Sequence, residues 1–72
     1  MFKPKIIMAN HKFQLDQRVS TPLGEGVIDT MPYNDESDVY GVWLDKPEFH
    51  ETSHGVVPLH WKPIPEKYIT AI

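Results

Sequence analysis

Short runs of apolar and β-branched residues alternate along the chain with turn-forming residues, and no stretch shows a long apolar period of 3.6 residues. Runs of this kind, separated by glycine and proline, are typical of β-strands and not of a helical bundle. We predict strands at residues 17–21, 26–31 and 39–45, a short strand around Val56 and Val57, and a final short strand near Ile64.

Turn signals separate these runs. Pro22 and Gly24 predict a tight turn, residues 32–38 read as a polar loop, and HWKPI at 60–64 predicts a further tight turn of 3₁₀ type. Five short strands in about 50 residues predict a small closed barrel, since closure removes exposed sheet edges. The flanks PKIIMAN and KYITAI are apolar enough to be strands, either paired with each other or with another chain.

Strand alternation in VYGVWLD separates the residues of the third strand into two faces. Tyr40, Val42 and Leu44 share one face, and Trp43 lies on the other. If Val42 and Leu44 face the core, Trp43 faces outward, where a terminal segment covers it or a partner binds it. Trp61, at the late turn, is the second candidate. The alternative is that both tryptophans cap a small core.

The length of 72 residues allows one domain with a thin core, because a chain this short buries only about 60% of its unfolded surface. Without cysteine, neither disulfides nor thiolate chemistry is available. No apolar run approaches the roughly 20 residues of a membrane span, and the N-terminus lacks the apolar stretch of a signal peptide. We therefore expect a soluble, cytoplasmic protein.

The net charge of −3 is unevenly distributed. Residues 33–54 carry six acids against the single base Lys46. This balance disfavours non-specific binding to a phosphate backbone, which needs a positive surface. A nucleic-acid-binding barrel remains the alternative, and it depends on the basic residues of the N-terminal region: Lys3, Lys5, Lys12 and Arg18.

The stretches QRVSTPLGEGVIDTM, VYGVWLD and GVVPLHWKPI together resemble the small SH3-like barrels of the Tudor and KOW type. The resemblance is closest to the Tudor-like RNA-polymerase-interacting modules of bacterial helicases and transcription factors. The residues that match that pattern are Asp16, Gln17, Val19, Gly24, Gly26, Val27, Val42, Leu44, Asp45, Leu59 and Ile64.

The resemblance implies an all-β, five-stranded SH3-like barrel over residues 14–65. A basic and apolar arm at 1–13 would precede it, and a tail or extra strand at 66–72 would follow. A free-standing barrel of this kind suits a phage-encoded or transcription-related protein, located in the bacterial or host-cell cytoplasm. The chain departs from the pattern in its acidic charge, its acidic loop and its histidine-rich segment.

That histidine-rich segment, HETSHGVVPLH, matches the H-E-x-x-H pattern of zinc hydrolases, with His50, Glu51 and His54 followed by His60. The pattern requires a helix, so that both histidines reach one zinc ion. Asp45 and Gly55 are acceptable helix ends, but a helix of two turns is marginal and the strand at Val56 competes with it. We do not expect an enzyme, since 72 residues cannot supply both a substrate cleft and a barrel. Non-catalytic zinc binding by His50, His54 and His60 is the alternative to a solvated loop.

The sequence thus favours a small non-catalytic module that binds a protein partner and needs no cofactor. An acidic surface would attract a basic partner by electrostatic steering. The residues predicted to bind it are the exposed aromatics and the acidic loop: Trp43, Trp61, Tyr33, Asp35, Glu36 and Asp38.

Overall fold

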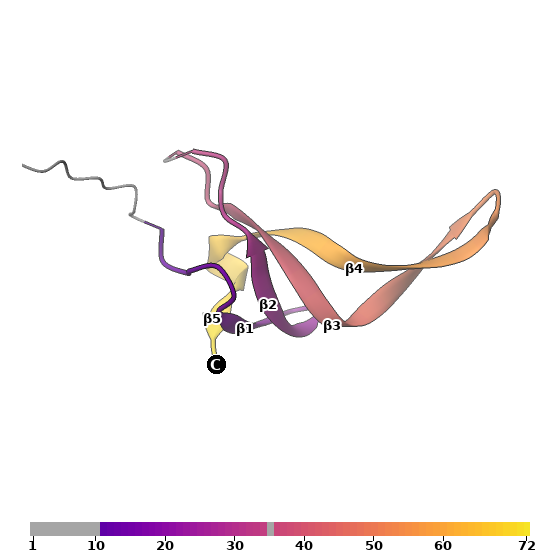
Figure 1. Ribbon diagram of the computed structural model, residues 1–72, viewed down its shortest axis with the longest axis horizontal. Helices are drawn as coiled ribbons and strands as arrows, with labels where there is room; N and C mark the ends of the chain where they lie inside the picture. Colours follow the sequence, from indigo (N-terminus) through magenta and orange to yellow (C-terminus); the bar gives the residue numbers. More distant parts are fainter. Residues whose placement is uncertain (1–10, 35) are drawn as a thin grey trace, which may run out of the picture.

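The computed structural model describes residues 11–34 and 36–72, which form one antiparallel sheet with the strand order β4–β3–β2–β1–β5 (Figure 1). This confirms the all-β prediction. Within the described residues no pairing joins β4 to β5, so the sheet is not closed. The elements are β1 (Arg18–Thr21), β2 (Gly24–Thr30), β3 (Val39–Thr52), β4 (Gly55–Pro65), the 3₁₀ turn η2 (Glu66–Tyr68) and β5 (Thr70–Ala71).

The third and fourth strands are much longer than predicted. β3 continues to Thr52, and β4 joins the segments around Val57 and Ile64 into a single strand. Their outer halves leave the other strands as a hairpin, at the right of Figure 1. Cross-strand pairing, interrupted by a bulge between Trp43 and Glu48, stabilises this length. The prolines of β4 are tolerated because β4 is an edge strand.

The C-terminal end also differs from the prediction. The 3₁₀ turn lies at η2 and not at residues 60–64, and the last strand is β5, which pairs with β1 through Val19 and Ala71. The suggested pairing between the two flanks involves residues 4–10, which lie outside the described residues. No helix in the described part of the chain is long and apolar enough to cross a membrane.

The core lies on the face of β3 that the alternation predicted. Tyr40, Val42 and Leu44 are fully buried, whereas Trp43 is 47% exposed. Strands β1 to β4, the segment before β1 and the residue after η2 all contribute to this thin core. The remaining core residues are Phe13, Val19, Ile28, Ile64 and Ile69.

The hydroxyl of Tyr40 connects three parts of this core. It accepts the backbone N–H of Phe13 at 3.1 Å and lies 3.5 Å from Oε2 of Glu66. Burial raises the pKa of Tyr40, against a lowering by the Phe13 hydrogen bond, so the phenol is neutral at physiological pH. Its hydroxyl thereby attaches the segment before β1 and the η2 turn to β3.

We expect Tyr40→Phe to lower the free energy of unfolding by about 2 kcal/mol, because the buried N–H of Phe13 loses its acceptor. Urea unfolding followed by circular dichroism measures the change. Tyr33→Phe is the matched control, since its ring is almost fully exposed and its loss of a hydroxyl should change stability by less than about 0.5 kcal/mol. Equal stabilities of the two variants would contradict this role for Tyr40.

Candidate functional site

An aromatic groove opens on the side of β3 opposite the core. Its volume is about 270 Å³, and Tyr33, Val39, Trp61 and Pro63 are among its lining residues. We call this set the aromatic groove. Val39 and Pro63 come from neighbouring strands, and Tyr33 comes from the loop between β2 and β3. The structure therefore brings together two of the predicted binding residues, Tyr33 and Trp61.

Trp61 is held in place by Gly41 and Thr30. A Cβ atom on Gly41 would lie 2.5 Å from Nε1 of Trp61, so the indole rests directly over the glycine. The same Nε1–H donates to Oγ1 of Thr30 at 3.3 Å. Trp61 nevertheless keeps 42% of its surface exposed. The ring is thus fixed in position and still accessible from one side.

Trp43 lies beside the aromatic groove without lining it. The register pairs Trp43 with Trp61 across β3 and β4. Its ring, however, stacks on His60, with centroids 4.8 Å apart and planes inclined by 1°. Nδ1 of His60 lies 2.8 Å from the carbonyl oxygen of Leu44, to which it donates in the Nδ1–H tautomer. Trp43 and His60 therefore form a separate aromatic pair near the bulge.

The acidic loop approaches the aromatic groove through Ser37, which is one of the lining residues. Oδ1 of Asn34 accepts the N–H groups of Glu36 at 2.9 Å and Ser37 at 3.0 Å, which shapes the loop as an Asx turn. Glu36 and Asp38, on either side of Ser37, are both exposed. Two exposed acidic residues therefore flank a lining residue of the groove in the sequence. Asp35 lies outside the described residues.

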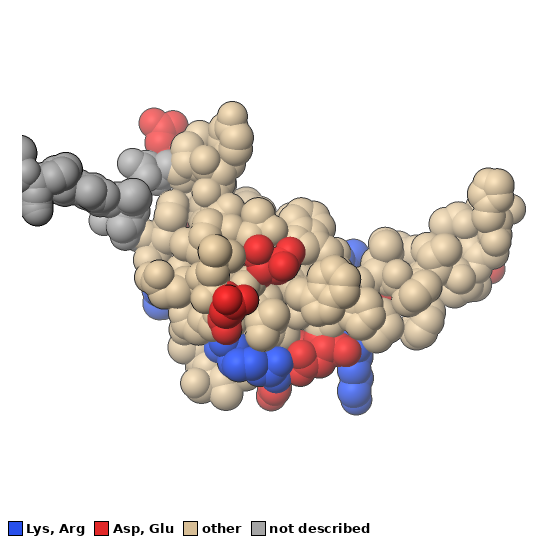
Figure 2. Space-filling view, in the orientation of Figure 1, with Lys and Arg blue, Asp and Glu red and all other residues tan. Residues whose placement is uncertain are grey.

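Two of the five described lysines and arginines, Arg18 and Lys62, are paired with acids. Arg18 forms a two-pronged contact with the Asp45 carboxylate at 2.8 and 2.7 Å, and Lys62 lies 2.8 Å from Glu48. On the face in Figure 2, Lys and Arg atoms lie next to Asp and Glu atoms and do not form a continuous basic surface. Lys3 and Lys5 lie outside the described residues. The nucleic-acid alternative gains no support from this arrangement.

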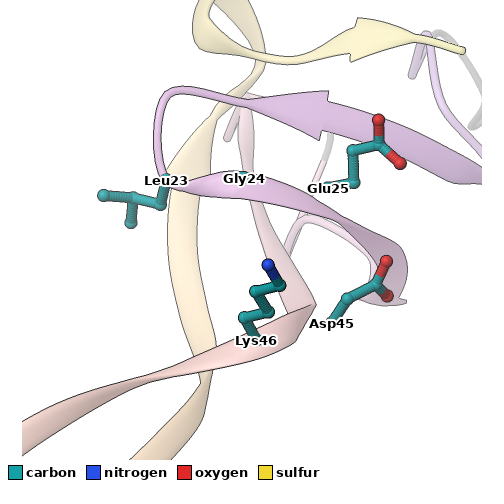
Figure 3. A pocket seen from close by; sticks show the side chains of 5 residues that line it. All are labelled: Leu23, Gly24, Glu25, Asp45 and Lys46. Carbon is teal, nitrogen blue, oxygen red and sulfur yellow. The ribbon is translucent and has the colours of Figure 1, made fainter.

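A shallow pocket lies next to the Arg18–Asp45 contact, at the foot of the hairpin. Glu25 and Asp45 lie on one side of it, and Leu23 points away from them (Figure 3). Arg18 contacts both carboxylates, with Glu25 at 3.4 Å. The acids here neutralise a neighbouring cation, and the pocket presents no free pair of carboxylates for acid–base chemistry.

These ion pairs predict an acid-dependent stability. The hydrogen bond from Arg18 lowers the pKa of Asp45, and the hydrogen bond from Lys62, followed by His50, lowers the pKa of Glu48. A carboxyl whose pKa is lowered on folding contributes stability above its ordinary pKa of about 4, and this contribution is lost as the pH falls through the folded pKa. The Arg18–Asp45 pair is exposed and the Lys62–Glu48 pair is only partly buried, so the effect is small.

We therefore expect the urea midpoint to fall on acidification below about pH 4, and to fall less steeply in Asp45→Asn. Urea titrations at a series of pH values measure how steeply the midpoint changes with pH in the parent and in the variant. Glu51→Gln is the control and should keep the parent slope, because Glu51 forms no ion pair within the described part of the chain. An unchanged slope in Asp45→Asn would show that the Arg18 contact does not contribute.

The H-E-x-x-H segment lies on a β-hairpin and not on a helix. His50 is in β3, His54 is in the turn and His60 is in β4. The helix that a zinc hydrolase requires is absent, and the ladder pairs His50 with Val57. Within the described residues no group of three metal-ligating side chains lies close enough to hold a metal ion. The structure therefore does not bring the three predicted ligands together.

A sequence signal for this hairpin is visible in retrospect. The stretch TSHG at 52–55 repeats the pattern of TPLG at 21–24, which forms the β1–β2 turn. In both turns the threonine hydroxyl donates to the glycine carbonyl at 2.8 Å, and the glycine has a positive φ, 122° at Gly24 and 112° at Gly55. The T-x-x-G repeat thus identifies a second hairpin inside the apparent metal motif.

Comparisons of the chain with protein-family models, with curated proteins and with solved structures find no match.

Proposed function

We propose that the protein is a non-catalytic module that binds an extended, basic segment of a protein partner in the aromatic groove. The observation that carries this proposal is Trp61, which is fixed over Gly41 while 42% of its surface stays exposed. A fixed indole that leaves apolar surface exposed to water in so small a domain indicates a site that a ligand covers.

The aromatic groove has the features of an affinity-determining site. Tryptophan and tyrosine are enriched among the residues that dominate binding energy, and Trp61 lies next to Tyr33, which is 92% exposed. Because Thr30 and Gly41 already hold the indole, little side-chain freedom is lost when a ligand binds. Val39 and Pro63 supply rigid apolar walls on either side.

The charge of the neighbouring loop supports a basic ligand. Glu36 and Asp38 are exposed beside the groove, and the chain as a whole carries a net charge of −3. A lysine or arginine in the ligand would interact with these carboxylates and with the face of Trp61 or Tyr33. Complementary charge also accelerates encounter.

The five-stranded antiparallel sheet, although it is not closed, is compatible with the resemblance to small SH3-like barrels of the Tudor or KOW type. The transcription-related role that this resemblance implies is tested directly with purified bacterial RNA polymerase. In that case, adding the polymerase to ¹⁵N-labelled protein should broaden the signals of Tyr33, Val39 and Trp61 first. Unchanged signals would remove the polymerase as the partner and leave the peptide-binding role to its own test.

The binding role itself is tested by selecting peptides from a random display library on the immobilised protein, with Trp61→Ala as the counter-selection target. We expect the enriched peptides to combine Lys or Arg with apolar residues, and to shift the NMR signals of Tyr33, Val39, Trp61 and Pro63. Enriched peptides that bind Trp61→Ala equally well, or the absence of any enriched sequence, would overturn the proposal. A single-stranded oligonucleotide titrated at low salt tests the nucleic-acid alternative in parallel.

A further inference from the structure

The outer hairpin has two exposed faces and apolar residues on both of them. Beyond the bulge, residues 48–52 of β3 pair with residues 55–59 of β4 and with no other strand of the described chain. Phe49 is 69% exposed, and Val56 and Leu59 are also exposed. A two-stranded hairpin on its own is marginally stable in water. An additional strand would therefore stabilise this part of the molecule.

The two edges of the hairpin differ in their ability to accept another strand. The β4 edge of the hairpin carries Pro58, which has no N–H to donate, and Pro63 and Pro65 follow further along β4, so this edge resists pairing. The β3 edge is different, because β2 pairs only with residues 41–44 of β3. Residues 48–52 of β3 thus form a short edge without proline and without a partner among the described residues.

The turn determines which backbone groups face this free edge. A two-residue turn closes on Thr52 and Gly55, which makes them a hydrogen-bonded pair. The pairs Glu51–Val56 and Phe49–Pro58 then are non-hydrogen-bonded, so the N–H and C=O groups of Phe49 and Glu51 point away from β4. Pro58 agrees with this assignment, since it has no donor to offer to β3.

We propose that a second copy of this chain pairs with the free β3 edge, antiparallel and with the two-fold axis at His50. Phe49 of each copy would then exchange both backbone hydrogen bonds with Glu51 of the other, giving four in total. The result is a continuous four-stranded sheet in the order β4–β3–β3–β4. It uses no residue of the aromatic groove, so the dimer presents two grooves.

Charge and proline select this partner and this register. With the axis at His50, Glu48 lies opposite Thr52 and Glu51 lies opposite Phe49, so no two carboxylates face each other. With the axis at Phe49, Pro47 would oppose Glu51 and remove a donor. With the axis at Glu51, two carboxylates would oppose each other directly. The prolines of β4 at both outer edges then stop further strand addition, so the assembly closes as a dimer and not as a fibre.

Sedimentation velocity over a concentration series tests the dimer, with Glu51→Pro as the disrupting variant and Glu51→Ala as its control. Glu51→Pro removes one outward donor per copy and leaves the β3–β4 ladder intact. We expect the parent and Glu51→Ala to sediment at twice 8.3 kDa, and Glu51→Pro to raise the dimer dissociation constant at least about tenfold. Dispersed core signals in the ¹H–¹⁵N spectrum confirm that each variant is folded.

A second pair of variants keeps the test decisive if Glu51→Pro fails to fold. His50→Lys places two ammonium groups opposite each other at the axis and should also dissociate the dimer, whereas His50→Gln should not. Isotope-filtered NOEs between Phe49 of one copy and Glu51 of the other establish the register. A parent protein that is monomeric at every concentration, a dimer unaffected by His50→Lys, or NOEs from a different surface would each overturn the proposal.

Discussion

Replacing Gly26 by alanine is expected to lower the free energy of unfolding by about 3 kcal/mol. Gly26 lies in the middle of the sheet, paired with Val19 on β1 and with Leu44 on β3. A Cβ atom at this position would collide with the carbonyl oxygen of Trp43 and lie 2.9 Å from Cα of Leu44. Both contacts are backbone atoms, so no side-chain rotation relieves them. The alanine must separate β2 from β3 next to the buried Leu44.

Urea unfolding of Gly26→Ala, monitored by circular dichroism, measures this loss. Glu25→Ala is the matched control, because Glu25 is the neighbouring residue on β2 and its side chain is exposed. We expect that control to change the free energy of unfolding by less than about 0.5 kcal/mol. A Gly26→Ala protein as stable as the control would show that the two strands separate at little cost.

The core of the sheet was predictable because it depends on a local pattern. The alternation in VYGVWLD assigned Tyr40, Val42 and Leu44 to one face and Trp43 to the other, and burial confirms both assignments. A half-buried strand requires this period of two, and a shift of one residue would turn all its apolar side chains toward solvent. The buried face of such a strand can therefore be predicted from its own sequence, without knowledge of the neighbouring strands.

The length of the hairpin was not predictable in the same way. Asp45, Pro47 and Gly55 are acceptable as helix ends, and His50 and His54 have helical spacing, so local signals alone left helix, loop and strand in competition. Strand preference depends on cross-strand neighbours more than on the residue itself. Here the deciding contacts are the pairs from Glu48–Leu59 to Thr52–Gly55, which exist only once the T-x-x-G turn has formed.

Two residues of the aromatic groove were predictable, but its other members and its shape were not. Tyr33 and Trp61 were recognised as candidate binding residues from their positions near turns, yet they are 28 positions apart in the sequence. What joins them is Gly41 under the indole and Thr30 beside it, on two further strands. The stacking of Trp43 on His60 depends likewise on the bulge in the β3–β4 ladder, which no local pattern marks.

The function of the aromatic groove leads to the second large expected effect. We expect Trp61→Ala to weaken binding of the selected basic peptides about 30-fold, equivalent to about 2 kcal/mol, the loss typical of a dominant interface tryptophan. Isothermal titration calorimetry measures it. Tyr68→Ala is the matched control, because Tyr68 is an exposed aromatic residue that does not line the groove. Its affinity should stay within about twofold of the parent value.

Gly41→Ala distinguishes a positioned indole from one that merely adds apolar surface. The new methyl group would lie 2.5 Å from Nε1 and 2.7 Å from Cε2 of Trp61. The indole ring must therefore move away from residue 41, and its hydrogen bond to Thr30 is lost. All groove side chains remain present. We expect about a tenfold loss of peptide affinity, together with a shifted indole N–H signal for Trp61. An unchanged affinity with a shifted indole signal would mean that the indole contributes area alone, and that pre-organisation by Gly41 plays no part in binding.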